Sequence, residues 1–185
     1  MQTQWDSIVI GAGVAGCCTA RELARWQARI LVLEAGNDIC CGATRANSGI
    51  VHAGFDPKPG SAKAFYNKRG SQLYPQWAEE LGFPLITNGS LVVAYTDEEM
   101  ETVRELVARG LENGIEGVRE VSHDELLEME PNVSPDALGA LYAPTGGICD
   151  PYHVALRAGE NAARNGVEFA FNCREIGRAS CRERV

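Results

Sequence analysis

Three glycines near the start of the chain have the spacing of a turn that binds phosphates. Gly11, Gly13 and Gly16 follow directly after Ile8–Ile10, a β-branched run typical of a buried parallel strand. We expect Gly11 to permit a tight turn, Gly13 to let a pyrophosphate approach the backbone, and Gly16 to let a helix pack closely on the strand. The helix predicted over 14–26 would direct free N–H groups and a partial positive charge at those phosphates.

Glu34 is the second residue with a clear chemical use. It ends a predicted strand, Ile30–Leu33, about 20 residues beyond the glycines, where a carboxylate can accept hydrogen bonds from ribose hydroxyls. The same carboxylate would repel a 2′-phosphate, so NADP is not expected. Because strand, glycines, helix, second strand and acid come in the right order, the sequence predicts dinucleotide binding rather than an ordinary glycine turn.

A segment of small residues follows, from 35 to 54. Such a segment can bring its backbone against a flat ligand. Thr44, Asn47 and Ser48 offer hydrogen-bonding side chains, and Arg45 offers a positive charge. Asn47 or Ser48 could also cap a short helix over 49–52. The alternative is a polar loop without a binding role.

The rest of the chain alternates helical and strand patterns. Asn88-Gly89 lies between two β-rich runs, 85–87 and 90–95, and this pattern is typical of a hairpin. Pro75 predicts a kink or a break in the long helix around it. The other elements that we expect are helices over 61–81, 97–111, 122–129 and 152–165, and strands over 118–121, 138–143 and 167–171.

The order of these elements predicts an interrupted nucleotide-binding fold. The next helix–strand unit of the first type comes only at 150–171. We therefore expect an α/β protein with a Rossmann-like parallel sheet and an inserted antiparallel α+β segment that shapes a substrate pocket. The predicted domains are 1–60 for the first part of the nucleotide-binding domain, 61–148 for the inserted substrate or cap segment, and 149–174 for the return.

Composition excludes several classes of protein. The net charge of −8 argues against nucleic acid as a partner. Neither a signal peptide nor an apolar run long enough to span a membrane is visible, so a cytoplasmic location is expected, with peripheral contact with the inner membrane face left open. The seven cysteines include no C-x-x-C pair, so no metal site is expected, and Cys17 and Cys18 should pack as small apolar residues.

The last residues, 175–185, show neither strand alternation nor a helical stripe. They resemble the translation of a sequencing adapter. We therefore expect a non-native tail that begins near Arg174, with a natural polar tail as the alternative.

Four stretches together resemble one enzyme family. They are IVIGAGVAG with Glu34, TRANSGIVHAG at 44–54, NGSLVVA at 88–94, and LLEMEPN through GALYAPTGGICDPY at 126–152. The chain is similar to the FAD-dependent oxidoreductases of the D-amino-acid-oxidase superfamily. Within it, the glycerol-3-phosphate dehydrogenases and the L-2-hydroxyglutarate oxidases are most similar, and the likeness covers residues 5–174, the N-terminal part of such an enzyme.

The resemblance implies FAD in an extended form. Its pyrophosphate would lie on the glycine turn, its adenosine ribose on Glu34, and its flavin beside 44–52. The cofactor-binding residues implied are Gly11, Ala12, Gly13, Val14, Ala15, Gly16, Glu34, Ala35, Thr44, Arg45, Asn47, Ser48, Gly49 and His52. His52 is also the candidate catalytic base, and a histidine packed beside the flavin without a proton role is the alternative.

The resemblance also implies a reaction. Enzymes of this family transfer a hydride from a carbon that bears a hydroxyl or amine to the flavin, and pass electrons to a quinone, oxygen or a partner protein. We expect a dehydrogenase for a 2-hydroxy acid or a glycerol-3-phosphate-like substrate, with this part alone inactive. Glycerol-3-phosphate dehydrogenases often carry an Arg-Tyr pair just after the His-x-Gly sequence. Here Phe55-Asp56 follows Gly54 instead, and the Asp56 carboxylate would repel a phosphate. The alternatives are an amine or amino-acid oxidase, and a non-catalytic FAD-binding fragment.

Overall fold

The computed structural model describes residues 4–177. The chain divides into two compact units. The first contains the described residues of 1–48 and 150–185, and the second contains residues 49–149. The first unit is therefore made of two separate stretches of sequence, with the second unit inserted between them.

The first unit holds a parallel sheet. β1 (Ser7–Ile10), β2 (Ile30–Leu33) and β9 (Glu168–Ala170) lie in the order β1-β2-β9, and all pair in parallel. The register pairs Ser7 with Ile30 and Leu31 with Glu168. The predicted Rossmann-like sheet is confirmed, including its completion by a strand beyond residue 150.

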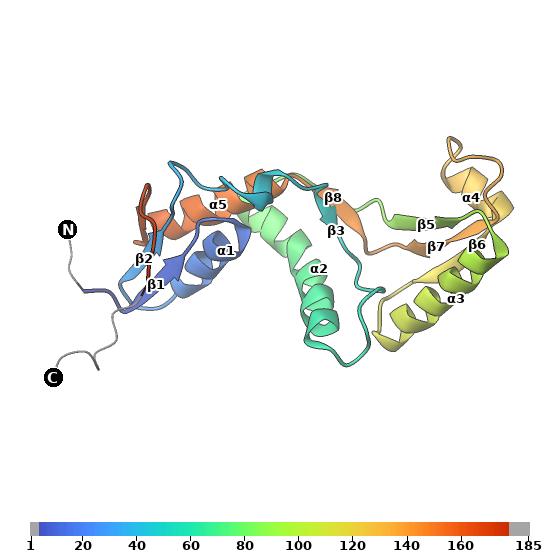
Figure 1. Cartoon of the computed structure of the whole chain (residues 1–185), viewed down its shortest axis with the longest axis horizontal. Coiled ribbons are helices and arrows are strands. Elements are labelled where there is room, and N and C mark those ends of the chain that lie inside the picture. Colours follow the sequence, from blue (N-terminus) through green and yellow to red (C-terminus); the bar gives the residue numbers. More distant parts are fainter. Residues whose placement is uncertain (1–3, 178–185) are drawn as a thin grey trace. The chain divides into compact units, whose positions relative to one another are not determined.

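Two helices with small buried residues pack beside this sheet. α1 (Val14–Leu23) and α5 (Pro151–Arg164) lie next to each other (Figure 1). Cys17 and Ala20 of α1 and Ala158 of α5 are fully buried, and a Cβ added at Gly159 would lie 3.4 Å from Cys17 Sγ. Burial raises the pKa of the Cys17 thiol to about 12, so it packs as a neutral, nearly apolar group, as predicted.

The second unit is built on two antiparallel sheets of three strands each. β3 (Ile50–Val51), β8 (Gly147–Cys149) and β4 (Leu85–Ile86) form one sheet, in the order β3-β8-β4. The other sheet has the order β5-β7-β6 and contains β5 (Ser90–Ala94), β7 (Gly139–Ala143) and β6 (Arg119–Ser122). The predicted antiparallel insertion is thus confirmed.

Three helices accompany these sheets: α2 (Ala62–Leu81), α3 (Asp97–Glu112) and α4 (His123–Met129). α3 runs beside the β5-β7-β6 sheet (Figure 1). Its buried residues Met100 and Val103 join Val118 and Leu141 in one apolar cluster. α4 contributes Leu126 to a second cluster, with Val121 and Ala140 among its members. Thr96 and Ser122 cap α3 and α4 by accepting hydrogen bonds from the amides of Glu99 and Glu125.

The predicted hairpin around Asn88-Gly89 is wrong. β4 pairs with β8, and β5 pairs with β7, so the two strands belong to different sheets. Gly89 does adopt the left-handed conformation of a turn, with φ of +76°, and its N–H donates to Gly146 O at 3.0 Å. The local turn signal was correct, but strands distant in sequence offered each run a better partner.

One further local prediction is wrong, and of the two outcomes expected at Pro75, a break in the helix does not occur. Residues 50–51 form strand β3 rather than a short helix over 49–52, because β8 pairs with this segment. α2 continues through Pro75 without a break. A proline removes one N–H donor from a helix, and the residues on both sides of Pro75 keep the helical conformation.

Candidate FAD-binding site

The glycine turn connects β1 to α1 very tightly. Gly11 has φ of +94°, a conformation that side chains rarely allow, and its N–H donates to Leu33 O at 2.7 Å. A Cβ added at Gly16 would lie 1.8 Å from Gly11 O. Glycine is therefore required at Gly16 because the first turn of α1 packs directly against the backbone that leads into it.

The N-terminus of α1 presents free donors. Its N-cap, Gly13, offers no side chain, and its first turn contains no acidic residue. Val14 donates its N–H to Thr44 Oγ1 at 3.0 Å. Among residues 4–177, the amides of Gly13 and Ala15 have no hydrogen-bond acceptor. Free amides at the positive end of a helix dipole form a donor set that suits a pyrophosphate.

Glu34 lies directly after β2, and its carboxylate faces the glycine turn. Oε2 accepts the N–H of Ala12 at 2.7 Å, and Oε1 accepts the N–H of Gly36 at 2.7 Å. These backbone N–H groups hold the pKa of the Glu34 carboxyl below its usual value. Each carboxylate oxygen has a further lone pair, so the group can still accept hydrogen bonds from ribose hydroxyls.

The segment after Glu34 folds back onto the same turn. Cys40 donates its N–H to Ala12 O at 3.0 Å while adopting φ of +57°. Thr44 and Arg45 lie in the short 3-10 helix η1 (Ala43–Arg45), and Asn47 Nδ2 donates to Thr44 O at 2.8 Å. The sequence did not reveal the part played by Cys40, because its residue type does not indicate a left-handed backbone.

The structure thus brings part of the predicted cofactor set together. Within the first unit, Ala12 is hydrogen-bonded to Glu34, and Val14 is hydrogen-bonded to Thr44. Ala35, Arg45 and Ser48 are exposed in the same unit. Gly49 and His52 belong to the second unit.

Gly49 and His52 flank β3. Gly49 is buried, and its carbonyl accepts the N–H of Cys149 at 2.9 Å. His52 is exposed and lines a hollow of about 100 Å³ together with Lys63 and Asn67. The buried Oδ1 of Asn67 has no donor among the described residues. The hollow is therefore lined by an imidazole, a lysine and a side-chain amide.

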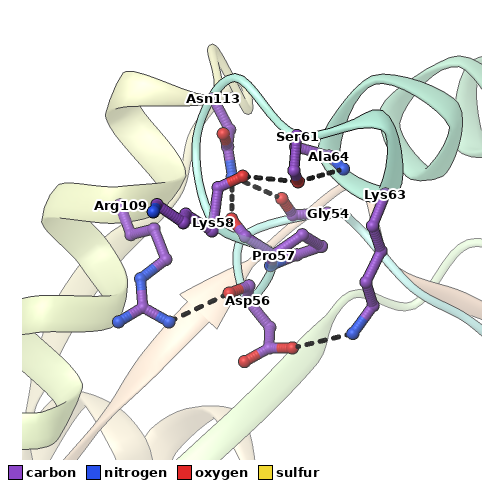
Figure 2. A network of polar contacts seen from close by, with 9 residues as sticks. All are labelled: Gly54, Asp56, Pro57, Lys58, Ser61, Lys63, Ala64, Arg109 and Asn113. Atoms are coloured by element: carbon purple, nitrogen blue, oxygen red, sulfur yellow. Dashed lines mark hydrogen bonds and ion pairs between the residues drawn. The ribbon is translucent and has the colours of Figure 1, made fainter.

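The loop that follows His52 is tied to α3 (Figure 2). Asn113 Nδ2 donates to Gly54 O at 3.1 Å and to Pro57 O at 2.8 Å. Arg109 Nη1 donates to Asp56 O at 3.0 Å, and Lys63 Nζ lies 3.6 Å from the Asp56 carboxylate. This network fixes the course of residues 54–61 and surrounds Asp56 with cations.

The residues described here include no group of histidine, cysteine and acidic side chains arranged to hold a metal ion. Within the same range, no helix combines the length and the apolar character needed to cross a membrane.

Comparison with known proteins defines the class. Residues 6–184 match the family model described as FAD dependent oxidoreductase, and the chain belongs to this family. The family depends on FAD, as the sequence predicted, and the free amides of α1 together with the Glu34 carboxylate fit the phosphates and the ribose of that cofactor.

The chain is also similar to individual proteins of known name. The chain is 42% identical over 165 residues to a glycerol 3-phosphate dehydrogenase of Caloramator mitchellensis, covering 89% of this chain and 34% of the relative. It is 35% identical over 176 residues to the L-2-hydroxyglutarate dehydrogenase of Escherichia coli K12, covering 94% and 41%. The FAD-bound L-alpha-glycerophosphate oxidase of Mycoplasma pneumoniae shares its fold with a TM-score of 0.88 at 31% identity, covering 92% and 45%. The chain spans less than half the length of these relatives.

Proposed function

We propose that this protein binds FAD and serves as the cofactor-binding part of a dehydrogenase or oxidase that acts on a hydroxyl-bearing carbon. The observation that carries the proposal is the turn between β1 and α1. In this turn, the amides of Gly13 and Ala15 have no acceptor among the described residues. The Glu34 carboxylate lies beside them, with Oε2 2.7 Å from the amide nitrogen of Ala12. Membership of the FAD-dependent family supports the choice of FAD over other dinucleotides.

The predicted site residues would divide the work as follows. The amides of Gly13 and Ala15 would hold the pyrophosphate, and Glu34 would accept the ribose hydroxyls. Thr44, Arg45, Asn47, Ser48 and Gly49 would lie along the cofactor. When bound, FAD supplies the hydride acceptor for the reaction. His52 would take the proton of the substrate hydroxyl, or would pack beside the flavin without a proton role.

The substrate class that we favour is a glycerol-3-phosphate-like or 2-hydroxy acid anion. Asp56 alone would repel such an anion. However, Lys63 lies 3.6 Å from its carboxylate and Arg109 binds its backbone carbonyl, so the positive charges around the loop outnumber the negative one (Figure 2). The negative charge of Asp56 therefore does not exclude a phosphate, and the relative with 42% identity is a glycerol 3-phosphate dehydrogenase.

FAD binding is the first test. Titration of FAD into the purified chain should give a saturable complex, measured by the change in flavin fluorescence. Riboflavin, which lacks both phosphates and the adenosine, should bind far more weakly. Equal binding of FAD and riboflavin, or no binding of either, would remove the basis of the proposal.

Reduction of the bound flavin is the second test. Glycerol 3-phosphate and L-2-hydroxyglutarate are added in turn to the anaerobic complex, and the flavin absorption band is followed. Loss of the band with one compound assigns the substrate class. Retention of FAD without reduction by either compound would leave the chain as a FAD-binding unit that needs further sequence for catalysis.

A further inference from the structure

Glu34 makes two contacts that ribose recognition does not require. Its carboxylate joins the amide of Ala12, in the glycine turn, to the amide of Gly36, just beyond β2, with both N···O distances at 2.7 Å. Such short bonds between N–H groups and a charged acceptor are among the stronger hydrogen bonds in proteins. One side chain thus connects the two loops that follow neighbouring strands.

The Ala12 amide depends on this contact. Ala12 is 0% exposed, so its N–H would be buried without a partner if the carboxylate were removed. Its carbonyl is held as well, by the N–H of Cys40 at 3.0 Å. The peptide groups that precede the free amides of α1 are therefore fixed on both sides.

The other end of the carboxylate bridge is also anchored. Glu34 N donates to Ala170 O and Cys173 N donates to Glu34 O, both at 2.9 Å. Asn172 N donates to Gly36 O at 2.8 Å. A Cβ added at Gly36 would lie 3.2 Å from Glu34 Oε1, so a glycine there leaves room for the carboxylate. The glycine turn is thereby connected, through Glu34, to the end of β9.

We propose that Glu34 is a positioning residue that holds the phosphate-binding turn in its binding conformation before any cofactor arrives, in addition to accepting the ribose hydroxyls. This inference rests on the proposed function for the identity of the ligand, but the carboxylate bridge itself does not. A turn that is already ordered loses less conformational freedom when a pyrophosphate binds. Loss of the bridge should therefore weaken binding of the phosphates as well as of the ribose.

The experiment separates these two roles with a pair of ligands. ADP offers adenine, the pyrophosphate and the ribose hydroxyls, whereas 2′,3′-dideoxy-ADP lacks only the two hydroxyls. Both are titrated calorimetrically into the wild-type chain, Glu34→Gln and the control Glu168→Gln, which removes an exposed carboxylate from β9. In Glu34→Gln we expect dideoxy-ADP to bind about tenfold more weakly, which corresponds to the loss of one charged hydrogen bond. The control should match the wild type.

Amide hydrogen exchange in the cofactor-free chain supplies a readout without any ligand. The Ala12 amide should exchange at least about tenfold faster in Glu34→Gln than in the wild type or in Glu168→Gln. If the variant does not fold, the wild type suffices: protection of Ala12 relative to its intrinsic exchange rate should fall as acid protonates Glu34.

Two results would overturn the inference. One is unchanged dideoxy-ADP binding with weakened ADP binding, which would leave Glu34 as a ribose ligand only. The other is an unchanged exchange rate at Ala12. Failure of the wild-type chain to bind either nucleotide would contradict the proposed function instead, and the Ala12 exchange rates would still decide whether the bridge orders the turn.

Discussion

Replacement of Gly16 by alanine tests how the glycine turn is packed. A Cβ at this position would lie 1.8 Å from Gly11 O, 3.0 Å from Gly11 C and 3.5 Å from a methyl group of Val9. The first two are backbone atoms, so they cannot move aside like the end of a flexible side chain. The turn would have to open by more than an ångström, which would disturb the hydrogen bond from Gly11 N to Leu33 O. We expect Gly16→Ala to destabilise the first unit by about 3 kcal/mol or more.

Gly70 provides the matched control. It also lies inside a helix, α2, but nothing lies within 4 Å of a Cβ added there. Helix propensity alone favours alanine over glycine by about 1 kcal/mol at an interior position. Gly70→Ala should therefore stabilise the second unit by up to that amount. Helix propensity alone predicts that both substitutions stabilise the chain. Only the close backbone contact at Gly16 predicts that Gly16→Ala destabilises it while Gly70→Ala stabilises it.

Urea denaturation measures both effects. In a Trp77→Phe background the remaining tryptophans, Trp5 and Trp26, both belong to the first unit, so their fluorescence reports its unfolding. Circular dichroism follows Gly70→Ala in the second unit. FAD titration should show that Gly16→Ala has lost binding while Gly70→Ala has kept it. A Gly16→Ala chain as stable as the wild type, with normal FAD binding, would refute the packing argument.

Three further outcomes follow from the described contacts. Leu126→Ala should lower the stability of the second unit by about 2–5 kcal/mol in urea titrations, because this side chain is 0% exposed. Asn113→Ala removes the donors to Gly54 O and Pro57 O, so proteolysis within 54–61 should accelerate and stability should fall by about 1–3 kcal/mol. Glu34 has a pKa below its ordinary value of 4.5, so its contribution is complete above that pH and is lost as the pH falls through the folded-state pKa. The stability difference between wild type and Glu34→Gln should therefore shrink in acid, and a constant difference down to pH 3 would contradict the assignment.

The elements that carry local signals were predictable. The strand Ile30–Leu33 was predicted with its observed bounds, because its β-branched run and its flanks are sufficient. Ser61 caps α2 through the Ala64 amide, and Asp150 caps α5 ahead of Pro151; serine and aspartate are common residue types at N-caps. The predicted helix over 14–26 ends earlier, at Leu23, with Ala24 as its C-cap. Ends of helices without a glycine carry little sequence signal.

Pairing between distant strands was not predictable from local patterns. Asn88-Gly89 indicates a turn whatever the flanking strands pair with, and here Leu85 pairs with Cys149 while Ser90 pairs with Ala143. β3 and β8 are too short to show any alternation, so neither was expected.

In the candidate site too, some residues were predictable from their types, whereas contacts made through the backbone were not. Gly11, Gly16 and Glu34 have types that their positions demand, so the sequence indicates them. The hydrogen bonds that Cys40 and Gly36 form through their backbones depend on conformation, which the side-chain types do not encode.

The two ends of the second unit lie side by side. Gly49 O accepts the N–H of Cys149, so residues 49–149 begin and finish at a single point. This unit is continuous in sequence, and it leaves the ribosome before β9 does. Once it has folded, β2 and β9 are separated by a short effective connection rather than by some hundred flexible residues. The 134 residues between β2 and β9 then count as roughly 33, a fourfold shortening. With about 0.6 kcal/mol for each doubling of loop length, the entropic cost of closing the parallel sheet falls by about 1 kcal/mol. The inserted unit thus acts as an intramolecular folding aid, and the nucleotide-binding sheet can be completed last during synthesis.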